Sequence, residues 1–174
     1  MARMRRALRL LALAAWCLAC RASVNGLKGI ACTPHGCVFT NDKSQEVCWY
    51  DLASGDVYRL PGEYEGPHQV SMSPAGDILV ADWLAGRVVR IIKSTAPDDD
   101  DDGDDGGDDD GAVSGWYDEA VVAASFGDDA GADGVVVSGD GRTAYVTLDT
   151  LGALAAVDLS TARGGGGGGA RFAR

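Results

Sequence analysis

The side chains best suited to chemistry stand at matching places in a repeat of about forty residues. His68 and Asp133 occupy the same position in the second and third copies, and Lys28 occupies it in the first. Imidazole is a good zinc ligand and carboxylate a good calcium ligand, so His68 and Asp133 could bind a divalent metal together. The cationic Lys28 would oppose such a metal. The alternative is that both side chains hydrogen-bond strand ends or face solvent.

The repeat that aligns these residues is a tight turn followed by a short apolar strand. The turn at residues 33–36 recurs at 73–76 and again at 138–141. An acidic stretch before the third copy accounts for its greater distance from the second. A unit of about forty residues, made of short strands and Gly turns, is typical of a β-propeller blade. We therefore expect an all-β chain, a partial β-propeller of about three four-stranded antiparallel blades.

Composition divides the chain into segments. Four early arginines precede the apolar run Leu10–Ala19, a pattern typical of a secretory signal peptide, with an organelle transit peptide as the alternative. That run is too short for a membrane-spanning helix, which needs about 20 apolar residues. The expected segments are a signal peptide at 1–22, a partial propeller at 23–163 with blades at about 23–62, 63–95 and 116–163, a disordered acidic low-complexity insertion at 96–111, and a Gly-rich flexible tail at 164–174.

The charge of the chain excludes several partners. The net charge is −11, and removal of residues 1–22 takes away five arginines and no acid, which leaves −16. Nucleic acids and anionic membranes each require a basic face, so neither is an expected partner.

Three cysteines lie close together in the first expected blade. Cys32 ends one strand, Cys37 opens the next across a tight turn, and Cys48 lies in the strand after that. A disulfide between two of them would suit an oxidising compartment. The alternative is that they are small buried residues. The spacing does not match a zinc knuckle.

Aromatic side chains offer a second kind of binding surface. They could line a rim at one end of the blades, since aromatic residues dominate binding surfaces, or fill the space between blades. The candidates are Trp49, Tyr50, Trp83, Trp116 and Tyr117.

The stretch from Pro67 to Asp82, with Gly86 to Arg90, resembles an NHL repeat, and the stretch from Asp133 to Val146 resembles blades of the gluconolactonase and senescence-marker-protein family. Both families belong to the six-bladed, TolB-like propeller class. The resemblance to NHL-type amidating lyases implies that His68 ligates a divalent metal. The resemblance to the lactonases implies a role for Asp133 beside Gly134, and for Glu65, which lies three residues out of register with Asp133.

The resemblance implies two kinds of function. The first is a secreted NHL-type module that acts as a binding scaffold for a protein, peptide or glycan. The second is a metal-dependent lactonase or a peptide-amidating lyase, with zinc or calcium as its cofactor. A closed propeller needs at least four blades, and three would leave two sheet faces uncovered. We therefore expect a fragment of a longer propeller, or self-association through the open blade faces.

Overall fold

The computed structural model describes residues 26–94, 116–160 and 170–173. In this part of the chain, twelve strands form three four-stranded antiparallel sheets, and within each sheet the strands pair in the order of the sequence. The only other regular element described is a 3-10 turn, η3, at Asp128–Ala130. No described helix is long and apolar enough to cross a lipid bilayer. The expected all-β class of three blades is therefore confirmed.

The twelve strands divide equally among the three sheets. The first blade consists of β1 (Leu27–Cys32), β2 (Gly36–Asn41), β3 (Glu46–Asp51) and β4 (Val57–Arg59). The second consists of β5 (Pro67–Met72), β6 (Ile78–Asp82), β7 (Arg87–Lys93) and β8 (Tyr117–Ser125). The third consists of β9 (Ala132–Val137), β10 (Thr143–Leu148), β11 (Ala153–Asp158) and β12 (Ala170–Ala173).

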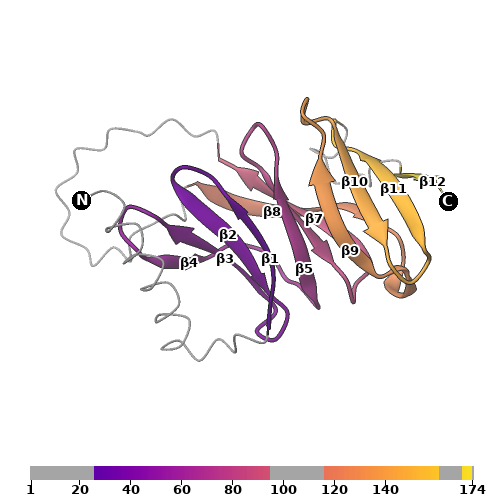
Figure 1. The fold of residues 1–174 in the computed structure, drawn as a ribbon, viewed down its shortest axis with the longest axis horizontal. Helices are drawn as coiled ribbons and strands as arrows, with labels where there is room; N and C mark the ends of the chain where they lie inside the picture. Colours follow the sequence, from indigo (N-terminus) through magenta and orange to yellow (C-terminus); the bar gives the residue numbers. More distant parts are fainter. Residues whose placement is uncertain (1–25, 95–115, 161–169, 174) are drawn as a thin grey trace.

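The sheets stack side by side in chain order, with the second between the other two (Figure 1). Strand β6 is buried along its whole length, because both faces of its sheet are covered. Successive strand residues point to opposite faces, so Ile78 contributes to the core shared with the first blade and Leu79 to the core shared with the third. The first strands of the three blades, β1, β5 and β9, are neighbours along one side of the stack.

The second blade is completed by a strand that we expected in the third. Sequence adjacency placed the end of this blade near residue 95 and the start of the next at 116. Instead, β8 pairs with β7, with Val88 opposite Ala124 and Ile91 opposite Ala120. The segment between these strands therefore interrupts one hairpin rather than separating two blades. The prediction of blade boundaries was wrong here.

The third blade also has a fourth strand, which sequence analysis did not find. Residues 170–173 form β12, which pairs antiparallel with β11 and places Phe172 opposite Ala155. The ring of Phe172 lies edge-on to that of Phe126 in the second blade, with centroids 6.1 Å apart. The expected flexible tail therefore ends in a strand. The expected signal peptide (1–22), the acidic insertion (96–111) and residues 164–169 lie outside the described residues.

A disulfide closes the first hairpin. It joins Cys32 to Cys37, which face each other at the end of the β1–β2 pair. This is one of the pairings that the sequence left open. Cys48 is half-buried on β3 and lies outside this bridge.

Candidate functional site

The first strand of each blade carries an irregularity at the same place. In each, two residues of the inner strand oppose one residue of its neighbour, which is a β-bulge. Lys28 and Gly29 oppose Thr40, His68 and Gln69 oppose Ala81, and Asp133 and Gly134 oppose Thr147. A bulge changes the direction in which a side chain points. Lys28, His68 and Asp133, which the forty-residue repeat placed at one position, therefore lie in equivalent bulges.

His68 and Asp133 are in direct contact across the second and third blades. The Nδ1 atom of His68 lies 2.8 Å from Oδ1 of Asp133. A carboxylate accepts but does not donate, so Nδ1 carries the hydrogen and Nε2 is left for another partner. The His68 side chain is 19% exposed and that of Asp133 is 48% exposed. The pair is therefore oriented by protein on one side and open to solvent on the other.

Trp83 supports the imidazole from its flat face. It follows β6, and its ring stacks on that of His68 with centroids 5.4 Å apart and planes 13° from parallel. Gly131 makes room for the indole, because a Cβ atom there would lie 2.8 Å from the Trp83 ring nitrogen. Gly131 also has φ of 62°, a conformation that favours glycine. The pair and the stack together restrict His68 to one orientation.

The backbone of His68 is held by the first blade. Gly29 N–H donates to the hydroxyl of Thr40 at 2.8 Å, and this hydroxyl donates to the carbonyl of His68. A Cβ atom at residue 29 would lie 2.6 Å from the same carbonyl, so only glycine allows the two blades to approach this closely. Sequence analysis missed Thr40. The signal was present, because Thr147 lies in the equivalent place beside Gly134.

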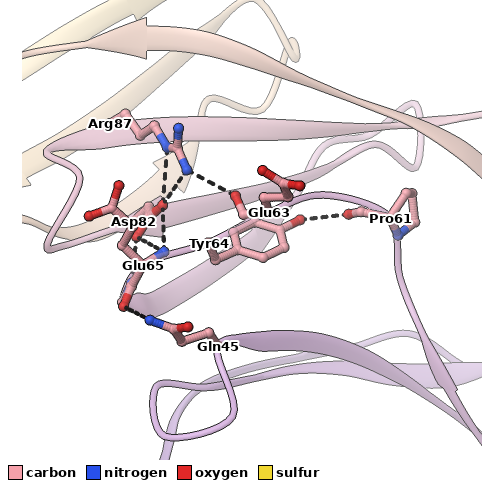
Figure 2. A network of polar contacts seen from close by, with 8 residues as sticks. Gln45, Pro61, Glu63, Tyr64, Glu65, Asp82 and Arg87 are labelled. Carbon is pink, nitrogen blue, oxygen red and sulfur yellow. Dashed lines mark hydrogen bonds and ion pairs between the residues drawn. The ribbon is translucent and has the colours of Figure 1, made fainter.

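A buried carboxylate shapes the segment that leads into β5 (Figure 2). Asp82 accepts hydrogen bonds from the backbone N–H groups of Glu65 and Gly66, at 3.1 and 2.7 Å. Its other oxygen accepts from Arg87 Nε at 3.0 Å. Arg87 also donates to the Glu63 carbonyl at 2.9 Å. These contacts fix the approach to His68 from the N-terminal side.

The same segment is anchored to the first blade. The hydroxyl of Tyr64 donates to the Pro61 carbonyl at 2.8 Å, and Gln45 Nε2 donates to the Glu65 carbonyl at 3.0 Å (Figure 2). Burial, followed by the nearby charge of Asp82, raises the pKa of Tyr64 well above its usual range. The Tyr64 phenol is therefore a neutral donor that holds the linker in place.

The other candidate metal ligands do not join the pair. Glu65 is exposed and is held through its backbone groups. Lys28 forms an ion pair with Asp42, with Nζ 3.5 Å from Oδ2. Among the described residues, no group of three or more His, Cys, Asp or Glu side chains is arranged to hold a metal ion. The structure thus brings together His68 and Asp133 but not Glu65.

Most of the expected aromatic rim is interior. Trp49, Tyr50 and Tyr117 are at most 4% exposed, and Trp49 packs against Tyr117 of the next blade with ring centroids 6.2 Å apart. These three are therefore not part of an exposed rim, and for Trp49 and Tyr117 the alternative that they fill the space between blades is the correct one. Trp116 is exposed, and Trp83 is part of the His68 site.

The fold is shared with solved proteins of differing activity. Virginiamycin B lyase from Staphylococcus aureus aligns with 84% of this chain and 40% of its own, at 14% identity and a TM-score of 0.57. A putative 6-phosphogluconolactonase from Bacteroides uniformis aligns with 84% of this chain and 39% of its own, at 13% identity and a TM-score of 0.54.

A chain of a nidogen/laminin complex aligns with 84% of this chain and 47% of its own, at 13% identity and a TM-score of 0.56. The chain therefore has a propeller-type fold and spans less than half the length of these relatives. No family model matches the sequence, and no curated protein matches it significantly. The narrower resemblance to NHL repeats and gluconolactonases stays a prediction.

Proposed function

We propose that this chain is a secreted β-propeller module that binds its ligand at the surface formed by His68, Asp133 and Trp83. The observation that carries the proposal is the 2.8 Å contact between His68 and Asp133. Because Nδ1 of the half-buried His68 ring bonds Asp133, its Nε2 is fixed in direction and can accept a hydrogen bond. The half-exposed Asp133 carboxylate lies beside it. Such a group suits a polar ligand, as part of a protein, peptide or glycan.

Two further observations support a binding role. The nidogen/laminin complex shows that a protein with this fold is found in a protein assembly. The strongly acidic chain disfavours nucleic acid as its ligand. The proposed secretion is supported by the basic and apolar start of the sequence and by the disulfide between Cys32 and Cys37.

Binding is tested with arrays of glycans and peptides, probed by the chain after removal of residues 1–22. We expect binding that is lost in His68→Ala and reduced in Asp133→Asn. His35→Ala is the matched control, since it removes the other histidine, which lies in the exposed turn of the first blade. Absence of binding, or binding that survives both site substitutions, would refute the proposed surface.

The second candidate function is catalysis by the pair itself. An imidazole oriented by a carboxylate is the usual arrangement of a general base, and it can remove a proton from a ligand bound at Nε2. A lyase and a putative lactonase share the fold. Catalytic zinc sites use three protein ligands, whereas two candidate ligands meet here. The residues present therefore do not fit that metal, and we place no step of the reaction on it.

Catalysis is tested with a panel of sugar lactones, peptides and virginiamycin B, with and without added zinc or calcium. Turnover that disappears in His68→Ala and falls in Asp133→Asn would support this candidate. The same metals are then tested for a rise in thermal stability, which a real site must produce. If turnover occurs without zinc or calcium, and neither metal raises the thermal stability, then His68 and Asp133 act as the catalyst without a metal. No turnover of any substrate would leave binding as the function.

A further inference from the structure

Each outer blade turns one face away from the second blade, and apolar side chains are exposed on that face. On the third blade, neighbouring strands expose Val136, Tyr145 and Leu154, and Tyr145 lies directly opposite Val136. On the first blade, Ile30 is 61% exposed and lies opposite the half-buried Phe39. The second blade, by contrast, is covered on both faces. The outward face of the third blade thus corresponds to the face by which the second blade packs on the third. The outward face of the first blade corresponds to the face by which the second blade packs on the first.

The third blade contains part of the hydrogen-bond arrangement that links the first blade to the second. In the first blade, Gly29 N–H donates to Thr40, and the Thr40 hydroxyl donates to the carbonyl of His68 in the next blade. In the third blade, Gly134 N–H donates to Thr147 at 2.8 Å. Within the described part of the chain, the Thr147 hydroxyl has no such carbonyl to which it can donate. The Thr147 hydroxyl could therefore donate to the carbonyl of a bulged first strand in a further blade.

The first blade offers the matching group. Lys28 occupies the bulge position that His68 occupies in the second blade, so its carbonyl is the equivalent acceptor. The charges also correspond. Asp133 is half-exposed on the third blade, and Lys28 is 40% exposed on the first. If a first blade were placed after the third, its Lys28 would lie beside Asp133. This contact would resemble that of His68 with Asp133, but between two opposite charges.

We propose that two copies of this chain form a closed ring, in which the third blade of each copy packs against the first blade of the other. Each copy carries both halves of the contact, and such a head-to-tail contact produces a ring when the rotation closes. Two sets of three blades make six, within the range of four to eight that propellers use. In the ring, Thr147 donates to the Lys28 carbonyl of the second copy.

Sedimentation velocity of the chain without residues 1–22 tests the ring. We expect twice the mass of one chain for the wild type, and one chain mass for both Tyr145→Lys and Ile30→Lys, since each charge would be buried at the contact. Leu151→Lys is the matched control, because Leu151 is 54% exposed, between Tyr145 at 42% and Ile30 at 61%, but lies in the turn between β10 and β11. Circular dichroism checks that all variants are folded.

A mixing experiment tests the head-to-tail arrangement. The Tyr145→Lys and Ile30→Lys proteins are mixed in one sample. In a pair made of one copy of each, the third blade of the Ile30→Lys copy and the first blade of the Tyr145→Lys copy are both unsubstituted. We therefore expect association to return in part. Thr147→Val should weaken association about tenfold or more, and Thr147→Ser, which keeps the hydroxyl, should preserve it. A monomeric wild type would overturn the proposal. So would an Ile30→Lys variant that remains dimeric, because the first blade would then lie outside the contact.

Discussion

Arg90 on β7 donates through Nη1 to the carbonyl of Leu159 at 3.0 Å, and so links the second blade to the third. The guanidinium is almost fully buried, and its Nε lies 3.0 Å from Oδ2 of Asp77. Asp77 also accepts from the backbone N–H of Lys93 at 3.0 Å. One buried ion pair therefore holds a hairpin turn, the end of β7 and the neighbouring blade together.

Removing the acid should be costly, because it leaves a buried guanidinium without its counter-ion. We expect Asp77→Ala to lower the free energy of unfolding by about 3–5 kcal/mol in urea denaturation. Asp149→Ala, at an exposed position, should change it by less than about 0.5 kcal/mol. The double change Asp77→Leu with Arg90→Met should recover most of the loss. Equal effects of the two aspartate substitutions would contradict the buried pair.

Tyr117 makes stability depend on pH in the alkaline range. Burial and the nearby charge of Asp77 raise its pKa to about 12 from an ordinary value of 10.0. The folded state therefore favours the neutral phenol, so its contribution is complete below pH 10.0 and disappears as the pH rises through about 12.

The substitution Tyr117→Phe tests this dependence. At neutral pH it should cost about 1 kcal/mol, because the hydroxyl donates to the Gly76 carbonyl at 3.0 Å. Above pH 10.0 the difference from wild type should shrink and then reverse, as measured by urea denaturation across the range. A difference that stays constant with pH would show that the phenol is not buried as described.

The disulfide should stabilise the first blade by restricting the unfolded chain. Cys32 and Cys37 are separated by five positions, and a loop this short corresponds to about 2 kcal/mol. Replacement of both by serine should lower the free energy of unfolding by that amount in non-reducing buffer. Cys48→Ser is the control and should keep a reducible bridge. If mass spectrometry finds a bridge that includes Cys48, the assignment is wrong.

The sequence placed His68 and Asp133 at one position of a repeat and proposed a shared metal, whereas their direct hydrogen bond was not predicted. The repeat preserves the bulge as well as the strands, so residues at equal register are displayed on the same side of the stack. Trp83 was a candidate for a rim or for the space between blades, and its contact with His68 was not foreseen. That contact depends on where the turn after β6 folds, which the alternation of apolar residues does not determine.

The errors have two physical causes. Strand β8 was assigned to the wrong blade because it follows a long acidic segment, and loops within a hairpin are usually short. Strand β12 was missed because only four residues after a polyglycine run form it. For Trp49 and Tyr117 the sequence left a rim and the space between blades as alternatives, and they pack against each other between blades. Composition alone cannot decide which aromatic side chains are covered.

The imidazole nitrogens of His68 test the central claim most directly, and the chain has only two histidines to assign. In a ¹⁵N-labelled sample at mildly alkaline pH, we predict that neutral His68 carries its hydrogen on Nδ1. Asp133→Ala should remove this preference and leave the His35 signals unchanged. A His68 ring that carries its hydrogen on Nε2, and that does not respond to Asp133→Ala, would contradict the contact between the second and third blades on which the site depends.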